Sequence, residues 1–216
     1  MSQHTLTLLR FTYKKLKEKL TVSDSKKLFY EQFTYVIPGL YKRIVDEILV
    51  ELNLLNHQNE FKQDFLFSIG LTETFKELMT AYEPVKRLNL LFESLCNSTN
   101  FEAKVIQEIS QKSRKEFENK SANDILKLLK EKSKAKIYPS RILNLGIYLL
   151  ISDSKDFQEK NESEKNKIIS DIFEKLNLST NKAEKDIGIY KSTISKMEQA
   201  KELIEELRAK DKKKEK

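Results

Sequence analysis

Residues 36–55, VIPGLYKRIVDEILVELNLL, constrain the fold more than any other stretch of the chain. Pro38 suits the first turn of a helix, because its fixed φ is helical and its missing N–H has no partner there. Apolar residues then follow at helical spacing and form one broad face: Tyr41, Ile44, Val45, Ile48, Leu49, Leu52 and Leu55. Val50 and Leu54 widen that face. A helix this apolar predicts the centre of a helical domain rather than its rim.

The composition favours an all-α protein. The 216 residues include only four Gly and three Pro, and alternation of β-branched residues is scarce. We predict a multi-helix globular bundle with a long C-terminal coiled-coil-like helix. The predicted segments are a basic N-terminal arm at 1–20, a helical globular domain at 21–178, and the long helix with a basic tail at 179–216.

The net charge of +7 comes from the two ends of the chain. Residues 1–20 carry five basic residues and one acidic residue, and residues 209–216 carry five and two, so the ends supply +4 and +3. Residues 21–208 balance at 30 basic and 30 acidic residues, so the basic isoelectric point says little about the folded body. The basic ends suit an anionic membrane surface, and for residues 1–20 a solvated tail is the alternative.

Compartment signals point to a soluble protein in a reducing environment. No apolar run is long enough to span a bilayer, and LTLLRF near the N-terminus is too short and too interrupted for a signal peptide. The single cysteine, Cys96, excludes an intrachain disulfide. Its leucine-rich surroundings, LLFESLC, predict a small buried side chain rather than a reactive thiol. These signals are also compatible with peripheral contact with a membrane surface.

Local signals place several helix boundaries. Asp64 can cap a helix whose interior contains Gly70, and because an interior glycine costs about 1 kcal/mol relative to alanine, this glycine suggests a close helix crossing. Residues 99–102, Thr-Asn-Phe-Glu, match a capping box. We predict a loop at 130–136 and a flexible connection at 152–163.

From residue 181 to about 211 the pattern predicts one helix, roughly 45 Å long. A rough heptad along it predicts an arm that packs on its own body or on a partner, through Ile187, Tyr190, Ile194, Met197 and Ile204. Residues 178–200 leave an alternative open, because they resemble a helix-turn-helix with Gly188 at the turn and thus a DNA-binding regulator. Glu184 counts against it, since that motif wants a small residue where its helices cross.

The sequence offers no catalytic motif. It contains two histidines, and it lacks a glycine-rich phosphate loop and a nucleophile elbow. Glu47 and Glu51 stand one turn apart, where salt bridges are favoured over acid–base catalysis. An enzyme hypothesis would rest on these two carboxylates with His57 and would require a buried polar cavity around them. We predict no catalytic, cofactor-binding or metal-binding residue, and no enzyme.

Several segments, in this order, resemble one protein family. They are VSDSKKLFYEQF, IPGLYKRIVDEILVELNLL, FLFSIGLTETF, LMTAYEP and LFESLC, followed later by YPSRILNLGIYLL and KDIGIYKSTISKMEQA. They resemble the thylakoid formation proteins, also called the photosystem II biogenesis family, of cyanobacteria and plastids, over most of residues 21–215. In that family the counterpart of the helix-turn-helix segment is part of a long C-terminal helix.

The resemblance implies a non-enzymatic, all-helical factor at the thylakoid surface. It implies support of photosystem II biogenesis and repair, through maintenance of FtsH-type membrane protease complexes. The implied partners are that protease, photosystem II components or both, with peripheral contact on the cytoplasmic side of the thylakoid membrane. No nucleic acid, cofactor or small-molecule substrate is expected. Plant members carry a transit peptide, and the lack of one here fits a cyanobacterial cytoplasm.

Overall fold

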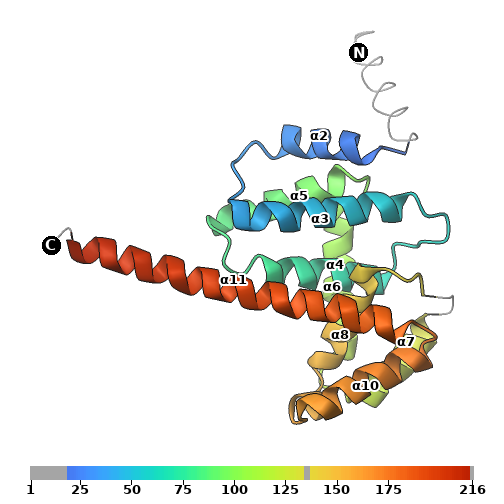
Figure 1. The fold of residues 1–216 in the computed structure, drawn as a ribbon. Coiled ribbons are helices and arrows are strands. Elements are labelled where there is room, and N and C mark those ends of the chain that lie inside the picture. The colour runs from blue at the N-terminus through green and yellow to red at the C-terminus, as the bar shows by residue number, and fades with distance from the viewer. Residues whose placement is uncertain (1–18, 134–136, 215–216) are drawn as a thin grey trace, which may run out of the picture. The chain divides into compact units, whose positions relative to one another are not determined.

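The fold is that of a computed structural model, which describes residues 19–133 and 137–214 (Figure 1). The regular elements within these residues are all helices, as predicted. They form two compact units that alternate along the sequence. Unit one comprises the described residues up to Phe61 with Pro84–Lys104, and unit two comprises Lys62–Glu83 with the described residues from Val105 onward. The segments 1–20, 21–178 and 179–216, which follow one another along the chain, stay a prediction, and only residues 19 and 20 of the predicted arm are described.

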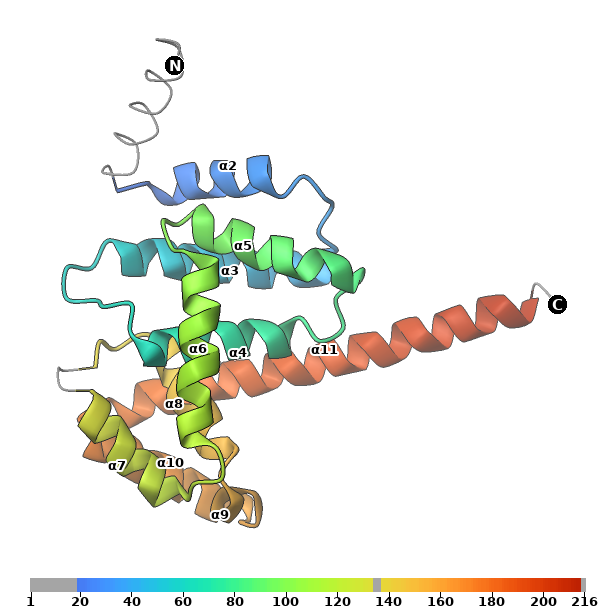
Figure 2. The same ribbon diagram turned by 180° about the vertical axis from the view of Figure 1, so that it is seen from behind.

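Unit one is built around the helix at residues 36–55. Its elements are α2 (Val22–Gln32), α3 (Gly39–Asn56), the 3-10 turn η1 (Val85–Arg87) and α5 (Leu88–Asn97). Pro38 is the residue before the first turn of α3, as its fixed φ predicted. The predicted apolar face of α3 is buried, and α2 and α5 pack on this helix (Figure 2). Of the two residues predicted to widen that face, Val50 is half-buried and Leu54 is 53% exposed.

A buried amide connects α2 to α3 in unit one. Asn53 on α3 is 2% exposed, and its Nδ2 donates to the Leu20 carbonyl and to the Ser25 hydroxyl, each at 2.8 Å. Thr21 and Asp24 close the start of α2 with a reciprocal capping box. Burial of Asn53 costs little because both amide hydrogens have partners, and its contacts fix how α2 lies on α3.

Unit two contains the remaining helices. Its elements are α4 (Phe65–Leu78), α6 (Ala103–Phe117, whose first two residues fall in unit one), α7 (Ala122–Lys132), α8 (Arg141–Ser152), α9 (Lys155–Gln158), α10 (Glu162–Lys175) and α11 (Thr180–Lys214). Asp64 caps α4 as predicted, since its carboxylate accepts from the Phe67 N–H at 3.0 Å. Helix α8 is buried along almost its whole length, which makes it the core of this unit.

The tightest contact in unit two is the crossing of α4 and α8. A Cβ on Gly70 would lie 2.2 Å from the Ile142 carbonyl oxygen. A Cβ on Gly146 would lie 2.9 Å from the Leu66 carbonyl oxygen and 3.0 Å from the Cα of Gly70. The two glycines therefore let the backbones of α4 and α8 touch. The close crossing predicted from Gly70 is confirmed.

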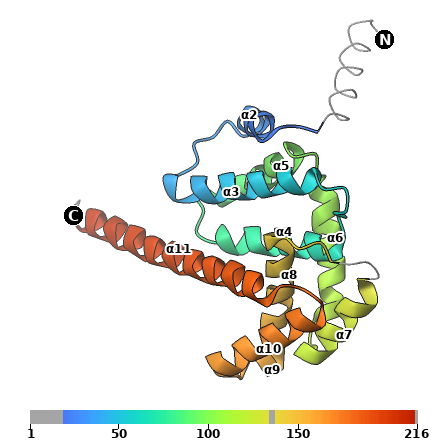
Figure 3. The ribbon, with the colours of Figure 1, turned by 45° about the vertical axis from the view of Figure 1, so that its right-hand side comes forward.

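Helix α11 runs without interruption from Thr180 to Lys214 and packs on α8, α10 and α4. Figure 3 shows its N-terminal half against these helices and its C-terminal half continuing past them. At 1.5 Å per residue it is about 50 Å long. Gly188 lies inside the helix, so the predicted long C-terminal helix is confirmed and the alternative, a helix-turn-helix at 178–200, is wrong.

Three other local predictions need correction. The capping box at 99–102 is wrong, because the Thr99 hydroxyl donates back to the Leu95 and Cys96 carbonyls at the end of α5, and α6 begins only at Ala103. The connection at 152–163 contains the short helix α9. The loop at 130–136 begins later than predicted, since α7 continues to Lys132, and residues 134–136 lie outside the described residues.

Within the described ranges, no helix combines the length and the apolar character that crossing a membrane requires.

Candidate functional site

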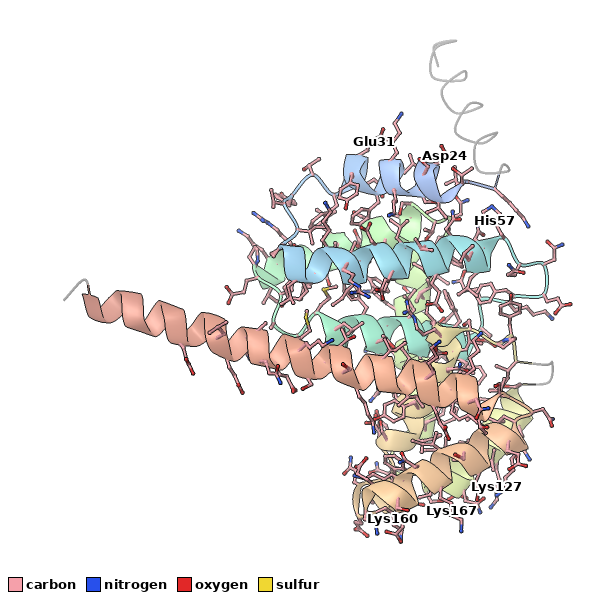
Figure 4. The ribbon with its side chains drawn as sticks, in the orientation of Figure 1. Asp24, Glu31, His57, Lys127, Lys160 and Lys167 are labelled. Carbon is pink, nitrogen blue, oxygen red and sulfur yellow. The ribbon has the colours of Figure 1, made fainter. Side chains whose placement is uncertain are left out.

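Two of the three residues of the enzyme hypothesis, Glu47 and His57, make the contacts of a helix surface and a helix end. Glu47 accepts from the Arg43 Nε at 2.9 Å, one turn away on α3. His57 follows the last residue of α3, where Figure 4 shows it, and its Nδ1 lies 2.8 Å from the Asn53 carbonyl oxygen. Its own carbonyl accepts from the Lys19 ammonium at 2.9 Å. These contacts stabilise the end of α3 and give no support to acid–base catalysis.

Cys96 is fully buried in unit one. Burial, with a smaller contribution from the charge of Glu93, raises the pKa of its thiol to about 12. Because the thiolate is the reactive form, a thiol with this pKa is inert at neutral pH. The prediction of a buried structural cysteine is confirmed. Among the residues that the structure describes, no group of three His, Cys, Asp or Glu side chains is placed to hold a metal ion.

The helix-turn-helix residues are part of α11. The Thr193 hydroxyl donates to the Ile189 carbonyl at 2.8 Å, one turn back along the same helix. Glu184, at the position where the motif wants a small residue, accepts from the Ser170 hydroxyl of α10 at 2.9 Å. Thr193 is therefore bonded to its own helix, and no separate recognition helix exists for it to belong to.

Buried polar contacts attach α11 to the core of unit two. Asn144 in the middle of α8 donates to the Asp186 carboxylate at 2.8 Å, and both residues are buried. The Tyr190 hydroxyl donates to the Glu77 carboxylate at the end of α4. Burial, and next the hydrogen bond to Glu77, raise the pKa of Tyr190 above its ordinary value, so this phenol stays protonated. The polar contacts fix the register of α11 on α8 and α4.

A second polar cluster lies around Arg114 on α6. Its guanidinium is 2.9 Å from the Glu73 carboxylate of α4 and also pairs with Asp153, just after α8. One cation thus connects three helices of unit two. Sequence reasoning missed this cluster and the Asn144–Asp186 pair. The sequence signal for the pair was that Asn144 and Asp186 each interrupt the apolar face of a predicted helix.

A pocket of about 410 Å³ opens between α10 and α11, and we call it the α10–α11 pocket. Its lining residues are Glu162, Asn166, Ile169, Glu184, Ile187, Gly188 and Lys191. Two of these residues, Ile169 and Ile187, are almost fully buried and give the pocket an apolar floor. Gly188 contributes to its size, because a Cβ at this position would meet no heavy atom within 4 Å.

The charged residues that line the α10–α11 pocket are two acidic residues and one basic residue. Glu162 and Glu184 are acidic, and Lys191 lies 3.7 Å from Glu162. Glu162 is also 3.3 Å from Lys165 on its own helix. An apolar floor beside carboxylates can accept an apolar side chain that is followed by a basic or amide group. The pocket therefore fits a protein partner better than a reaction, since it holds no nucleophile with a partnered base.

Comparisons with known proteins cover most of the chain. A family model described as "Thylakoid formation protein" matches residues 21–216. Protein Thf1 of Prochlorococcus marinus strain MIT 9312 is 79% identical over 199 residues, which cover 92% of this chain and 99% of that protein. Protein Thf1 of Prochlorococcus marinus subsp. pastoris strain CCMP1986 is 68% identical, over 93% of this chain and 100% of that protein.

A solved structure shares the fold. It is titled "Structure of Psb29 at 1.55A", and it superposes on this chain with a TM-score of 0.77 at 25% sequence identity. The superposition covers 90% of this chain and 98% of the other. The all-helical fold class is thus confirmed by an experimental structure of a relative.

Proposed function

Because this chain belongs to the thylakoid formation protein family, we propose that it supports photosystem II biogenesis and repair by binding an FtsH-type thylakoid protease complex. Thylakoid formation and photosystem II biogenesis are the role of the family. The finer step is a mechanism by contact alone: the protein holds a membrane-protein complex together and changes no covalent bond. Photosystem II components are the second class of partner.

The α10–α11 pocket carries this proposal. Helix α11 is long and continuous, and Asp186 and Tyr190 attach it to the core of unit two on either side of Gly188. The pocket beside Gly188 is therefore held in shape before any partner arrives, which lowers the entropy cost of binding. Its floor and rim suit an apolar anchor with a basic neighbour on the partner's surface.

The proposed location is the cytoplasmic side of the thylakoid membrane, bound peripherally. The charge distribution supports it: residues 1–20 carry +4 and residues 209–216 carry +3, whereas residues 21–208 are neutral overall. Basic segments are attracted to anionic bilayers by about 1 kcal/mol per charge near the surface. Both ends of the chain thus favour binding at the membrane surface, where this protein can contact a membrane protease.

The test fills the α10–α11 pocket without disturbing the helix. Leucine at position 188 is a good helix former and projects a side chain into the space that Gly188 leaves open. Full-length tagged protein, wild type and Gly188→Leu, is expressed in cyanobacterial cells and captured from solubilised thylakoids. We expect the wild type to recover FtsH-type protease subunits and Gly188→Leu to recover about tenfold less, a change that corresponds to about 1.4 kcal/mol of binding energy.

The matched control is Gly188→Ala, which adds only a methyl group and leaves most of the pocket open. It should capture protease subunits as the wild type does, and helix content by circular dichroism should be the same for all three proteins. Equal capture by Gly188→Leu and the wild type would remove the pocket from the mechanism. Recovery of photosystem II subunits alone would shift the proposal to that partner, and recovery of neither would contradict it.

A further inference from the structure

A group of exposed apolar side chains stands at one edge of unit one, and we call it the unit-one corner. It consists of Tyr35 and Val36 in the loop between α2 and α3, Leu40 in the first turn of α3, and Val85 in η1. Val36 is 87% exposed and Val85 is 68% exposed. Figure 2 shows the end of the α2–α3 loop beside the beginning of α5, where η1 lies. Exposed apolar side chains that gather on one part of a surface can mark an interaction site.

The loop that presents Val36 is pinned on both sides. Phe33 and Ile37 are buried, at 1% and 8% exposure, and Phe33 stacks on Phe29 with ring centroids 5.9 Å apart. The rings of Tyr35 and Phe33 pack edge to face with their centroids 5.5 Å apart, and the Arg87 guanidinium lies over the Tyr35 ring, 4.0 Å from its centroid. These contacts join the loop to η1 and hold Val36 outward, so the corner is a built feature of unit one.

The charged residues within the two segments that form the unit-one corner are all basic. Residues 33–43 and 84–87 contain four basic residues and no acidic residue, the basic ones being Lys42, Arg43, Lys86 and Arg87. Arg43 pairs with Glu47, and Arg87 lies over Tyr35. Lys42 and Lys86 are exposed, and no ion pair is recorded for either with the residues that the structure describes. Glu31 and Glu83 stand just outside the two segments.

This combination of side chains fits a bilayer surface. The valine side chain has no polar atom, so Val36 and Val85 can enter the boundary between headgroups and acyl chains without removing a polar side-chain group from water. Lys42 and Lys86, which follow these segments' apolar residues in the sequence, can extend along an apolar layer and place their ammonium groups among anionic headgroups. A protein partner would need a cavity shaped to accept two valines on a loop and a turn, whereas a bilayer needs none.

We propose that the unit-one corner is a membrane-contact site, which inserts Val36 and Val85 into the interface of an anionic bilayer while Lys42 and Lys86 bind its headgroups. The site rests on the proposed peripheral membrane location, and it is separate from the α10–α11 pocket, since its residues belong to unit one. Unit one would bind the lipid surface, and the pocket of unit two would bind the protein partner.

Flotation of the full-length protein with vesicles tests the proposal. One set of vesicles contains phosphatidylcholine alone, and the other replaces roughly a third of it with phosphatidylglycerol to supply the negative charge. We expect the wild type to float with the anionic vesicles and to remain at the bottom with the neutral ones. Added salt should weaken the binding, because the attraction between lysines and headgroups is screened.

Two double variants separate the apolar and the basic contributions. Val36→Ser/Val85→Ser and Lys42→Gln/Lys86→Gln change only exposed side chains, so both should fold as the wild type does. Each is expected to lower the vesicle partition coefficient about tenfold or more. For the lysine variant, each Lys near an anionic surface contributes roughly a fivefold change in that coefficient. The matched controls are Leu54→Ser, an apolar residue exposed elsewhere on α3, and Lys27→Gln/Lys104→Gln. Both controls should bind as the wild type does.

The outcomes distinguish this site from the proposed function. Wild-type vesicle binding by both double variants would overturn the membrane-contact site and assign lipid binding to other basic segments. Loss of protease capture by Val36→Ser/Val85→Ser with unchanged vesicle binding would also overturn it and would make the corner a protein surface. Gly188→Leu should keep full vesicle binding, so failure of the pocket hypothesis would leave this result untouched.

Discussion

At the crossing of α4 and α8, Gly70 and Gly146 leave space that the backbone of the neighbouring helix fills. Between α10 and α11, a Cβ on Gly188 would meet no heavy atom within 4 Å apart from its chain neighbours and the nearby backbone of its own helix. Both helix pairs lie in unit two and both contain an interior glycine, which by itself lowers helix stability. At the first pair the loss is offset by close packing, whereas at the second it has no compensation inside the protein. The difference fits a folding role for Gly70 and Gly146 and the proposed binding role for Gly188.

The largest effect on stability is expected at the crossing of α4 and α8. Gly70→Ala places a methyl group 2.2 Å from the Ile142 carbonyl oxygen, so α4 and α8 must separate. Overpacking of this kind costs about 3 kcal/mol, and it involves backbone that cannot rotate away. A urea titration followed by circular dichroism should show a lower midpoint at an unchanged slope. Gly146→Ala should cost less, because its contacts begin at 2.9 Å.

A smaller effect is expected at the attachment of α11. Tyr190→Phe removes the hydrogen bond to Glu77 and should lower the free energy of unfolding by about 1.5 kcal/mol at neutral pH. The folded state raises the pKa of Tyr190, so this contribution is complete below the ordinary tyrosine pKa of about 10 and is lost as the pH rises above it. The urea midpoints of wild type and variant should therefore converge in alkaline buffer. A constant difference at every pH would show that the phenol does not titrate in this way.

The smallest effect on stability is expected at Gly188, between α10 and α11, and there the substitution should stabilise the protein. Gly188→Ala should raise the free energy of unfolding by about 1 kcal/mol, because alanine is the better helix former and its methyl group meets no neighbour. The same urea titration measures it. Destabilisation by Gly188→Ala would mean that the pocket is closed in solution, and the contrast between the two pairs would then disappear.

Much of the fold follows from local sequence signals. Pro38 and Asp64 mark the beginnings of α3 and α4 as predicted, and the apolar face of residues 41–55 is the buried face of α3. The interior glycine at position 70 correctly predicts a close crossing. These signals work because each depends on one helix turn or on one face of one helix.

Where sequence reasoning fails, a local signal has two structural solutions. The Thr99 hydroxyl can begin one helix or end another, and here it closes α5 while Asn100 adopts a positive φ of 63°. Gly188 can make a turn, but Asp186 and Tyr190 are bonded to the core on both sides of it, and these tertiary contacts keep α11 straight. The α10–α11 pocket could not be predicted, because it depends on which faces of two helices meet.

The central claim is that the α10–α11 pocket binds the protein partner, and crosslinking from inside the pocket tests it most directly. Photoreactive benzoylphenylalanine replaces Asn166, which lines the pocket, or Lys127, an exposed residue of α7 in the same unit (Figure 4). The proteins are irradiated in isolated thylakoids, and the crosslinked products are identified by mass spectrometry. The account predicts a protease-subunit adduct from position 166 and none from position 127. Adducts from position 127 alone, or equal adducts from both positions, would contradict it.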